Sequence, residues 1–156
     1  MKIDFEHRRF FDLIDLGELP SHGSLEGASG LKSNSGPYPT NLVETGNLAW
    51  RTPFRDLSCA QVHTLAEQKM GLEWLGRPII AFATKYPFAT IRNYAGEMAV
   101  LCLRAADELS RVAQPEFGRW LKGNFAWLDR VRGWSPTFRD EVKAALAAAR
   151  ETVRAQ

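Results

Sequence analysis

Cys59, His63 and Glu67 are the residues of this sequence whose types and spacing could do chemistry. A thiol, an imidazole and a carboxylate are the parts of a cysteine nucleophile with its base and orienting group. Steps of four residues place the three on one face of a helix, where side chains project outward in parallel. A base on such a stripe reaches its nucleophile poorly, so the sequence does not favour an enzyme that uses Cys59.

A zinc site is the other chemistry that a Cys and a His four residues apart could serve. Zinc takes three or four protein ligands, and no second pair stands at metal spacing here. The pattern favours a core Cys59 beside a half-exposed His63, while His7 and His22 lie in isolated polar settings. GASG and GLEWLG match neither the dinucleotide nor the phosphate-loop fingerprint. We therefore predict no catalytic residue, no metal and no cofactor.

The elements that position these residues are helices with marked ends, from residue 58 onward. Ser58 followed by Gln61 is a capping-box pattern and predicts a helix beginning at Cys59. Gly71 is a plausible stop, and the next helix opens at Leu72 with Pro78 near its start and ends before Pro87.

A central helix is expected next, beginning near Ala95 or Gly96 and apolar on most faces for two turns. Short helices follow after Pro115 and after Asn124, and Ser135 with Pro136 caps the last helix. The sequence predicts an all-α, single-domain helical bundle whose helical domain spans residues 58–156, with the central helix as its core.

Residues 1–57 form a long, partly irregular N-terminal segment in this interpretation. Apolar residues between Phe10 and Leu16 favour a short amphipathic helix, although Ile3 and Phe5 could equally start a strand. From Pro20 to Pro53 the chain is rich in Ser, Gly, Asn, Thr and Pro, which punctuate turns, so we expect a long loop whose second half docks on the domain.

Composition fits a soluble cytoplasmic protein. The 45% hydrophobic and 24% charged residues are globular averages, and two cysteines in apolar helical contexts make no disulfide framework. No apolar run reaches the length of a membrane span. The net charge is +2, yet residues 1–19 hold five acids against three bases, which is a local −2.

A nucleic-acid-binding or regulatory module is the alternative that the C-terminal half leaves open. Residues 101–156 hold ten bases against seven acids, and some of the arginines surround Trp120, Trp127 and Trp134. Basic residues interleaved with aromatics can bind single strands. Aromatics at helical spacing more often make core contacts with arginine stems laid across them, so we expect no direct nucleic-acid partner.

The middle of the chain has a recognisable pattern. The run LSCAQVHTLAEQKMGLEWL, residues 57–75, together with Pro87-Phe88 and Tyr94-Ala-Gly-Glu97, resembles immunity proteins of bacterial contact-dependent growth inhibition systems, in a family of small helical proteins. That family tends to show Gln-Lys-x-Gly-Leu-Glu-aromatic-Leu, then Pro-Leu/Phe, then Tyr-x-Gly-Asp/Glu before a Leu-rich helix. From Gln68 to Glu97 the chain follows this pattern without a gap, except that Arg77 stands where the family has proline.

The resemblance implies a cytoplasmic immunity protein that binds its cognate toxin C-terminal domain in a one-to-one complex and occludes the active site or substrate face. Delivered toxins of this kind are often nucleases with basic clefts, which an acidic surface complements. We expect the motif itself to be scaffold, because its Gly, Pro and Glu suit turns and helix starts. The acidic segment outside it, at Asp12, Asp15 and Glu18, is the predicted partner-binding surface.

Overall fold

Helices carry the fold over the residues that the computed structural model describes, which are 4–15, 23–32 and 40–156. The α-helices are α1 (Leu25–Ser29), α2 (Asn41–Arg51), α3 (Cys59–Glu67), α4 (Leu72–Lys85), α5 (Glu97–Arg104), α6 (Ala106–Val112), α7 (Gln114–Leu121) and α8 (Pro136–Arg154). Short 3-10 helices occur at Phe10–Asp12, Phe54–Asp56 and Ala126–Asp129. Within the described ranges there is no strand, and the predicted all-α class is confirmed.

The predicted serine caps begin the helices where the sequence places them. The Ser58 hydroxyl accepts the Gln61 N–H at 3.1 Å, and the Gln61 side chain accepts the Ser58 N–H at 3.0 Å. This reciprocal pair satisfies two N–H groups that the first turn of α3 leaves unpaired. Ser135 does the same for α8 by accepting the Phe138 N–H at 3.0 Å, with Pro136 at the first helical position.

Two left-handed glycines begin the helices on either side of the 85–96 connection. Gly71 has φ 71° and precedes α4, while Gly96 has φ 84° and precedes α5. A Cβ at residue 71 would lie 2.8 Å from a methyl carbon of Leu25, and one at residue 96 would lie 3.1 Å from the Trp134 ring. Both sites therefore require glycine for conformation and for space.

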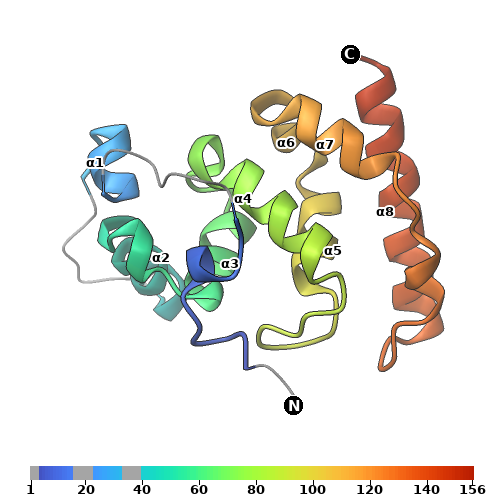
Figure 1. Cartoon of the computed structure of the whole chain (residues 1–156), viewed down its shortest axis with the longest axis horizontal. Helices are drawn as coiled ribbons and strands as arrows, with labels where there is room; N and C mark the ends of the chain where they lie inside the picture. Colours follow the sequence, from blue (N-terminus) through green and yellow to red (C-terminus); the bar gives the residue numbers. More distant parts are fainter. Residues whose placement is uncertain (1–3, 16–22, 33–39) are drawn as a thin grey trace.

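The central position belongs to α5, as the apolar sequence predicts. Every residue from Glu97 to Leu103 is buried, and the helix packs against α3, α4 and α8. Figure 1 shows α5 behind α4, between the α1–α3 group and the α7–α8 side of the molecule. The helical run does not continue unbroken, because the backbone departs from helical angles at Ala105. This break lets α6 pack against α7 and α8.

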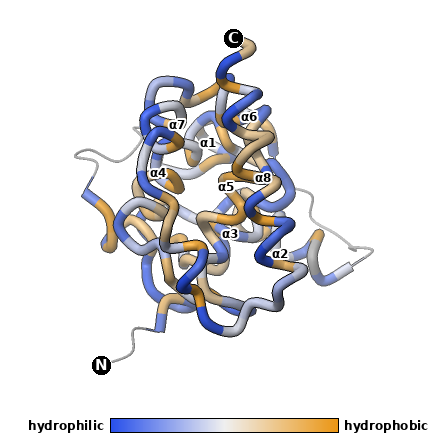
Figure 2. The backbone as a smooth tube through the Cα atoms, turned by 90° about the vertical axis from the view of Figure 1, so that its right-hand side faces the viewer, coloured by the Kyte–Doolittle hydropathy of each residue, from blue (hydrophilic) through white to orange (hydrophobic). Residues whose placement is uncertain are grey.

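Hydrophobic and hydrophilic residues alternate along α2 and α8, so each helix has an apolar and a polar face (Figure 2). In α8 the buried stripe is Val142, Leu146 and Ala149. No helix within the described ranges is both long enough and apolar enough to cross a membrane.

The described N-terminal residues form a 3-10 turn in place of the expected amphipathic helix. The Phe10 N–H donates to the Leu57 carbonyl at 2.8 Å, and the Cys59 N–H donates to the Arg8 carbonyl at 2.9 Å. Backbone groups that a helix would have used are thus paired with the start of α3. Phe10 is fully buried and stacks on Phe82 of α4 at 5.5 Å between ring centroids.

The expected long loop contains α2, which propensity did not reveal. Thr40 caps this helix by accepting the Val43 N–H at 3.2 Å, and the buried Trp50 donates its indole N–H to the Leu31 carbonyl at 2.6 Å. Weak helix formers such as Gly46 hide the pattern, but packing against α3 stabilises it. A Cβ at residue 46 would lie 3.3 Å from Gln68, so glycine allows the close approach.

Pro78 lies further inside α4 than the sequence indicates. The helix begins at Leu72, so Pro78 falls in its second turn, where it supplies no N–H to the Trp74 carbonyl. The helix nevertheless continues to Lys85, one residue before Tyr86 and two before Pro87.

Candidate functional site

The predicted partner-binding acids divide between described and undescribed parts of the chain. Asp12 and Asp15 are exposed, whereas Glu18 lies outside the described residues. The backbone beside them is anchored, because the Leu13 carbonyl accepts from the Lys85 ammonium at 3.1 Å and from the Tyr86 hydroxyl at 3.3 Å. The two carboxylates therefore project from a fixed segment.

The thiols are buried. Cys59 is 0% exposed, and burial raises its pKa to about 12, although the nearby Arg8 acts in the opposite direction. Burial also raises the pKa of the Cys102 thiol. A protonated, inaccessible thiol is a poor nucleophile, so Cys59 packs as a small hydrophobe.

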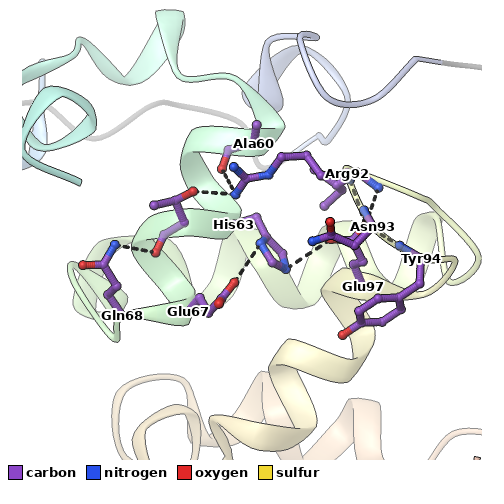
Figure 3. Close-up of polar contacts among 10 residues, drawn as sticks. Ala60, His63, Glu67, Gln68, Arg92, Asn93, Tyr94 and Glu97 are labelled. Carbon is purple, nitrogen blue, oxygen red and sulfur yellow. Dashed lines mark hydrogen bonds and ion pairs between the residues drawn. The ribbon is translucent and has the colours of Figure 1, made fainter. Parts of the chain in front are cut away.

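His63 is buried rather than half-exposed, which corrects the expectation drawn from its helical position. Its ring lies between two carboxylates (Figure 3), with Nε2 3.6 Å from Glu97 Oε2 and Nδ1 3.3 Å from Glu67 Oε2. The Glu67 side chain is 60% exposed and the Glu97 side chain is 0% exposed. His63 Nδ1 and Glu97 Oε2 are buried, and neither atom has a hydrogen-bond partner among the described residues.

Glu97 holds the loop before α5 through one oxygen. Its Oε1 accepts backbone N–H groups from Ile91 at 3.2 Å, Arg92 at 2.8 Å, Tyr94 at 2.9 Å, and Asn93. A buried carboxylate needs such donors to replace its lost hydration. The sequence indicates a carboxylate at the start of this helix; the structure adds that it folds back onto residues 91–94.

Arg92 ties the same loop to α3. Its guanidinium donates to Thr64 Oγ1 at 2.6 Å and to the Ala60 carbonyl at 3.4 Å. Ala60, His63, Thr64 and Glu67 lie on neighbouring turns of α3, so loop and helix share one polar network (Figure 3). This network is buried on the Glu97 side and open to solvent on the Glu67 side.

Burial governs the protonation of His63. Loss of hydration lowers its pKa below the ordinary 6.5; Glu97 and Glu67 oppose this shift, and Arg92 adds to it. At neutral pH the ring therefore carries one N–H, which can face only one of its two carboxylates. The other ring nitrogen is then a hydrogen-bond acceptor, and the carboxylate that it faces is also an acceptor.

A cavity of about 260 Å³ opens beside this network. His63, Glu67, Tyr94 and Arg104 line it, and Lys69 lies at its edge in an ion pair with Glu108 at 3.0 Å. Burial raises the pKa of Tyr94, so its phenol stays protonated as a donor. The cavity thus offers both donors and acceptors to a polar group. His63 and Glu67 are the lining residues that the sequence singled out.

Sequence reasoning missed the partnership of His63 with Glu97. The two residues are separated by a helix and a loop, and nothing in their spacing indicates contact. The Tyr-x-Gly-Glu run was the available signal, because it places a carboxylate three residues after Tyr94 where it can reach the preceding backbone.

The aromatic residues of the C-terminal half lie mostly in the core. Trp127 and Trp134 are buried, and the Trp134 indole donates to the Ala95 carbonyl at 2.8 Å. Arg139 lies over the Trp134 ring and donates to the carbonyls of Leu128 and Val131. Arginine stems therefore cover core aromatics, and the two buried rings are unavailable for stacking on bases.

Within the described residues, no three His, Cys, Asp or Glu side chains come together as a metal site would require. Comparison of the chain with family models, with curated proteins and with solved structures gives no match.

Proposed function

We propose that this chain is an immunity protein that binds and neutralises the C-terminal toxin domain of a bacterial contact-dependent growth inhibition system. The observation that carries the proposal is the joint spacing from Gln68 to Glu97. Three of its residues have a physical task in this fold. Gly71 and Gly96 make the left-handed helix starts, and Glu97 binds the backbone of residues 91–94.

Such a motif preserves a scaffold, and recognition then falls to surface outside it. Asp12 and Asp15 supply exposed negative charge on an anchored segment that the motif does not include. A nuclease cleft is basic because it binds phosphates, and acidic side chains complement it. The protein would act in the cytoplasm by covering the toxin's active site or substrate face in a one-to-one complex.

Growth protection tests the proposal directly. The test requires a toxin C-terminal domain whose gene lies immediately upstream of this reading frame, and this domain is expressed in a susceptible host with and without this chain. We expect growth to be restored, and the two proteins to elute together as a one-to-one complex. A toxin domain from an unrelated system serves as the control and should still stop growth.

Continued toxicity with no complex would refute the immunity role. In that case, retention of a single-stranded oligonucleotide by the purified chain would favour the nucleic-acid-binding alternative, whose remaining support is the exposed Arg111, Arg119 and Arg130.

A further inference from the structure

A second surface lies between α4 and α7. It adjoins the acidic N-terminal segment at Lys85, which lines this surface and donates to the Leu13 carbonyl. The two helices pack against each other, and a groove of about 580 Å³ follows their junction. This volume is more than twice that of the cavity beside His63, at about 260 Å³. It falls within the range of about 300–1,000 Å³ that is usual for ligand sites.

The groove floor is apolar and fixed. Ile80 is 4% exposed, and Ala81 and Trp120 are half-buried at the edges. The Trp120 ring is held edge-on against Phe125 at 5.1 Å and tilted against Phe117 at 6.0 Å, so the wall that it forms is preorganised. A rigid aromatic wall beside small residues can receive apolar side chains at little entropic cost.

The groove rim is basic. Arg77, Lys85 and Arg119 are exposed along it, and Glu116 is the acid that lines it. Glu116 Oε1 is 3.2 Å from Arg77 Nε, so this pair is internally neutralised. Arg119 makes no ion pair with any described residue, and Lys85 contacts a carbonyl and the Tyr86 ring rather than a carboxylate. The rim thus retains positive charge.

We propose that this groove binds an acidic amphipathic helix of a partner protein. Apolar residues spaced by three and four would enter between Ala81 and Trp120, and carboxylates on the flanks would meet Lys85 and Arg119. The part of α4 that lines the groove runs from Arg77 to Lys85 and gives a track of about 12 Å for such a helix.

A second copy of this chain fits the groove less well. The longest amphipathic helix within the described residues is α8, whose residues 136–154 include four bases (Arg139, Lys143, Arg150 and Arg154) against three acids (Asp140, Glu141 and Glu151). Its charge would therefore not complement a basic rim. The inference does not depend on the proposed immunity role, because neither Asp12 nor Asp15 lines the groove.

The test uses a fluorescent synthetic peptide about as long as α4, with leucines at helical spacing and glutamates elsewhere. A peptide with lysine in place of glutamate and a scrambled peptide are the controls, and anisotropy reports binding to the full-length chain. We expect the acidic peptide to bind most tightly, with affinity that falls as salt rises.

Variants locate the binding site. Ala81→Trp fills the groove and Arg119→Glu reverses its rim, and each should weaken binding of the acidic peptide by about tenfold or more. Ala147→Trp on the exposed face of α8 and Arg130→Glu outside the groove are matched controls and should bind like the wild type. Equal binding of all three peptides, unchanged binding by both groove variants, or dimerisation that Ala81→Trp abolishes would overturn the inference.

Discussion

His63 links two carboxylates that differ in their contact with water. Glu97 is fully buried and binds four backbone N–H groups through Oε1, whereas Glu67 is 60% exposed. A neutral imidazole can donate to one carboxylate at a time, and a protonated one could donate to both. Burial decides the balance by lowering the pKa of His63.

This lowered pKa predicts a pH-dependent stability. The unfolded chain titrates His63 near 6.5, and the folded chain titrates it lower, so between the two values the unfolded state binds more protons. The His63 contribution is therefore complete above pH 6.5 and is lost as pH falls through the folded pKa. Its slope is at most about 1.4 kcal/mol per pH unit.

Urea unfolding of wild type and His63→Gln across this pH range measures the effect. The difference between their unfolding free energies should shrink as the solution becomes more acidic. His7→Gln, at a histidine whose side chain is 78% exposed, is the control and should run parallel to wild type. Parallel profiles for wild type and His63→Gln would show that His63 does not titrate differently on folding.

Glu97→Gln should destabilise the fold by about 2 kcal/mol, because it converts charge-assisted hydrogen bonds to the 91–94 backbone into neutral ones. Glu73→Gln is a matched control: Glu73 also lies in the first turn of its helix, but it is exposed. Its unfolding free energy should stay within about 0.5 kcal/mol of wild type. Equal losses in the two variants would reduce the role of Glu97 to a general helix-start effect.

At the scale of elements, the turn from α3 to α4 decides how the two helices meet. The Met70 N–H donates to the Leu65 carbonyl and the Lys69 N–H donates to the Ala66 carbonyl, which is the Schellman arrangement. Lys69 occupies its left-handed position with φ 58°, where glycine is usual. The turn therefore contains a strained residue two positions before the left-handed Gly71.

Lys69→Gly should accordingly be more stable than Lys69→Ala by about 1 kcal/mol, because glycine removes the left-handed strain that alanine keeps. Both variants lose the ion pair with Glu108, so their difference isolates the backbone. Thermal unfolding compares them. A more stable alanine variant would mean that the turn does not hold residue 69 at positive φ.

The whole molecule separates its charge although its total is only +2. Residues 1–19 carry five acids and three bases, while the α4–α7 groove is rimmed by arginine and lysine. The two surfaces adjoin at Lys85, which lines the groove and donates to the Leu13 carbonyl. Beyond that junction their opposite charges can steer different partners, since each charge acts over about a Debye length of 10 Å or less at physiological salt.

Replacing Asp12, Asp15 and Glu18 together by Ala should slow association with the proposed toxin domain and weaken its salt dependence, because complementary charge acts mainly on encounter. Stopped-flow association at low and high salt measures both effects. A triple alanine replacement of Asp140, Glu141 and Glu151 on α8 is the charge-matched control. Unchanged rates at both salts would move the toxin-facing surface away from the N-terminal segment.

The sequence alone determined the parts of this protein that local physics decides. Ser58 with Gln61 and Ser135 with Pro136 begin helices because their side chains and ring suit unpaired helix N–H groups. Gly71 likewise predicted a helix junction, and the apolar run after Gly96 predicted a central helix.

The tertiary structure alone decided the rest, because it depends on residues distant in sequence. Phe10 lies in a 3-10 turn since its N–H pairs with Leu57, and α2 is helical since Trp50 is buried against the domain. His63 is a buried neighbour of Glu97 because α3 packs beside α5. Local propensities carry no information about such contacts. Desolvation and long-range hydrogen bonding determine them.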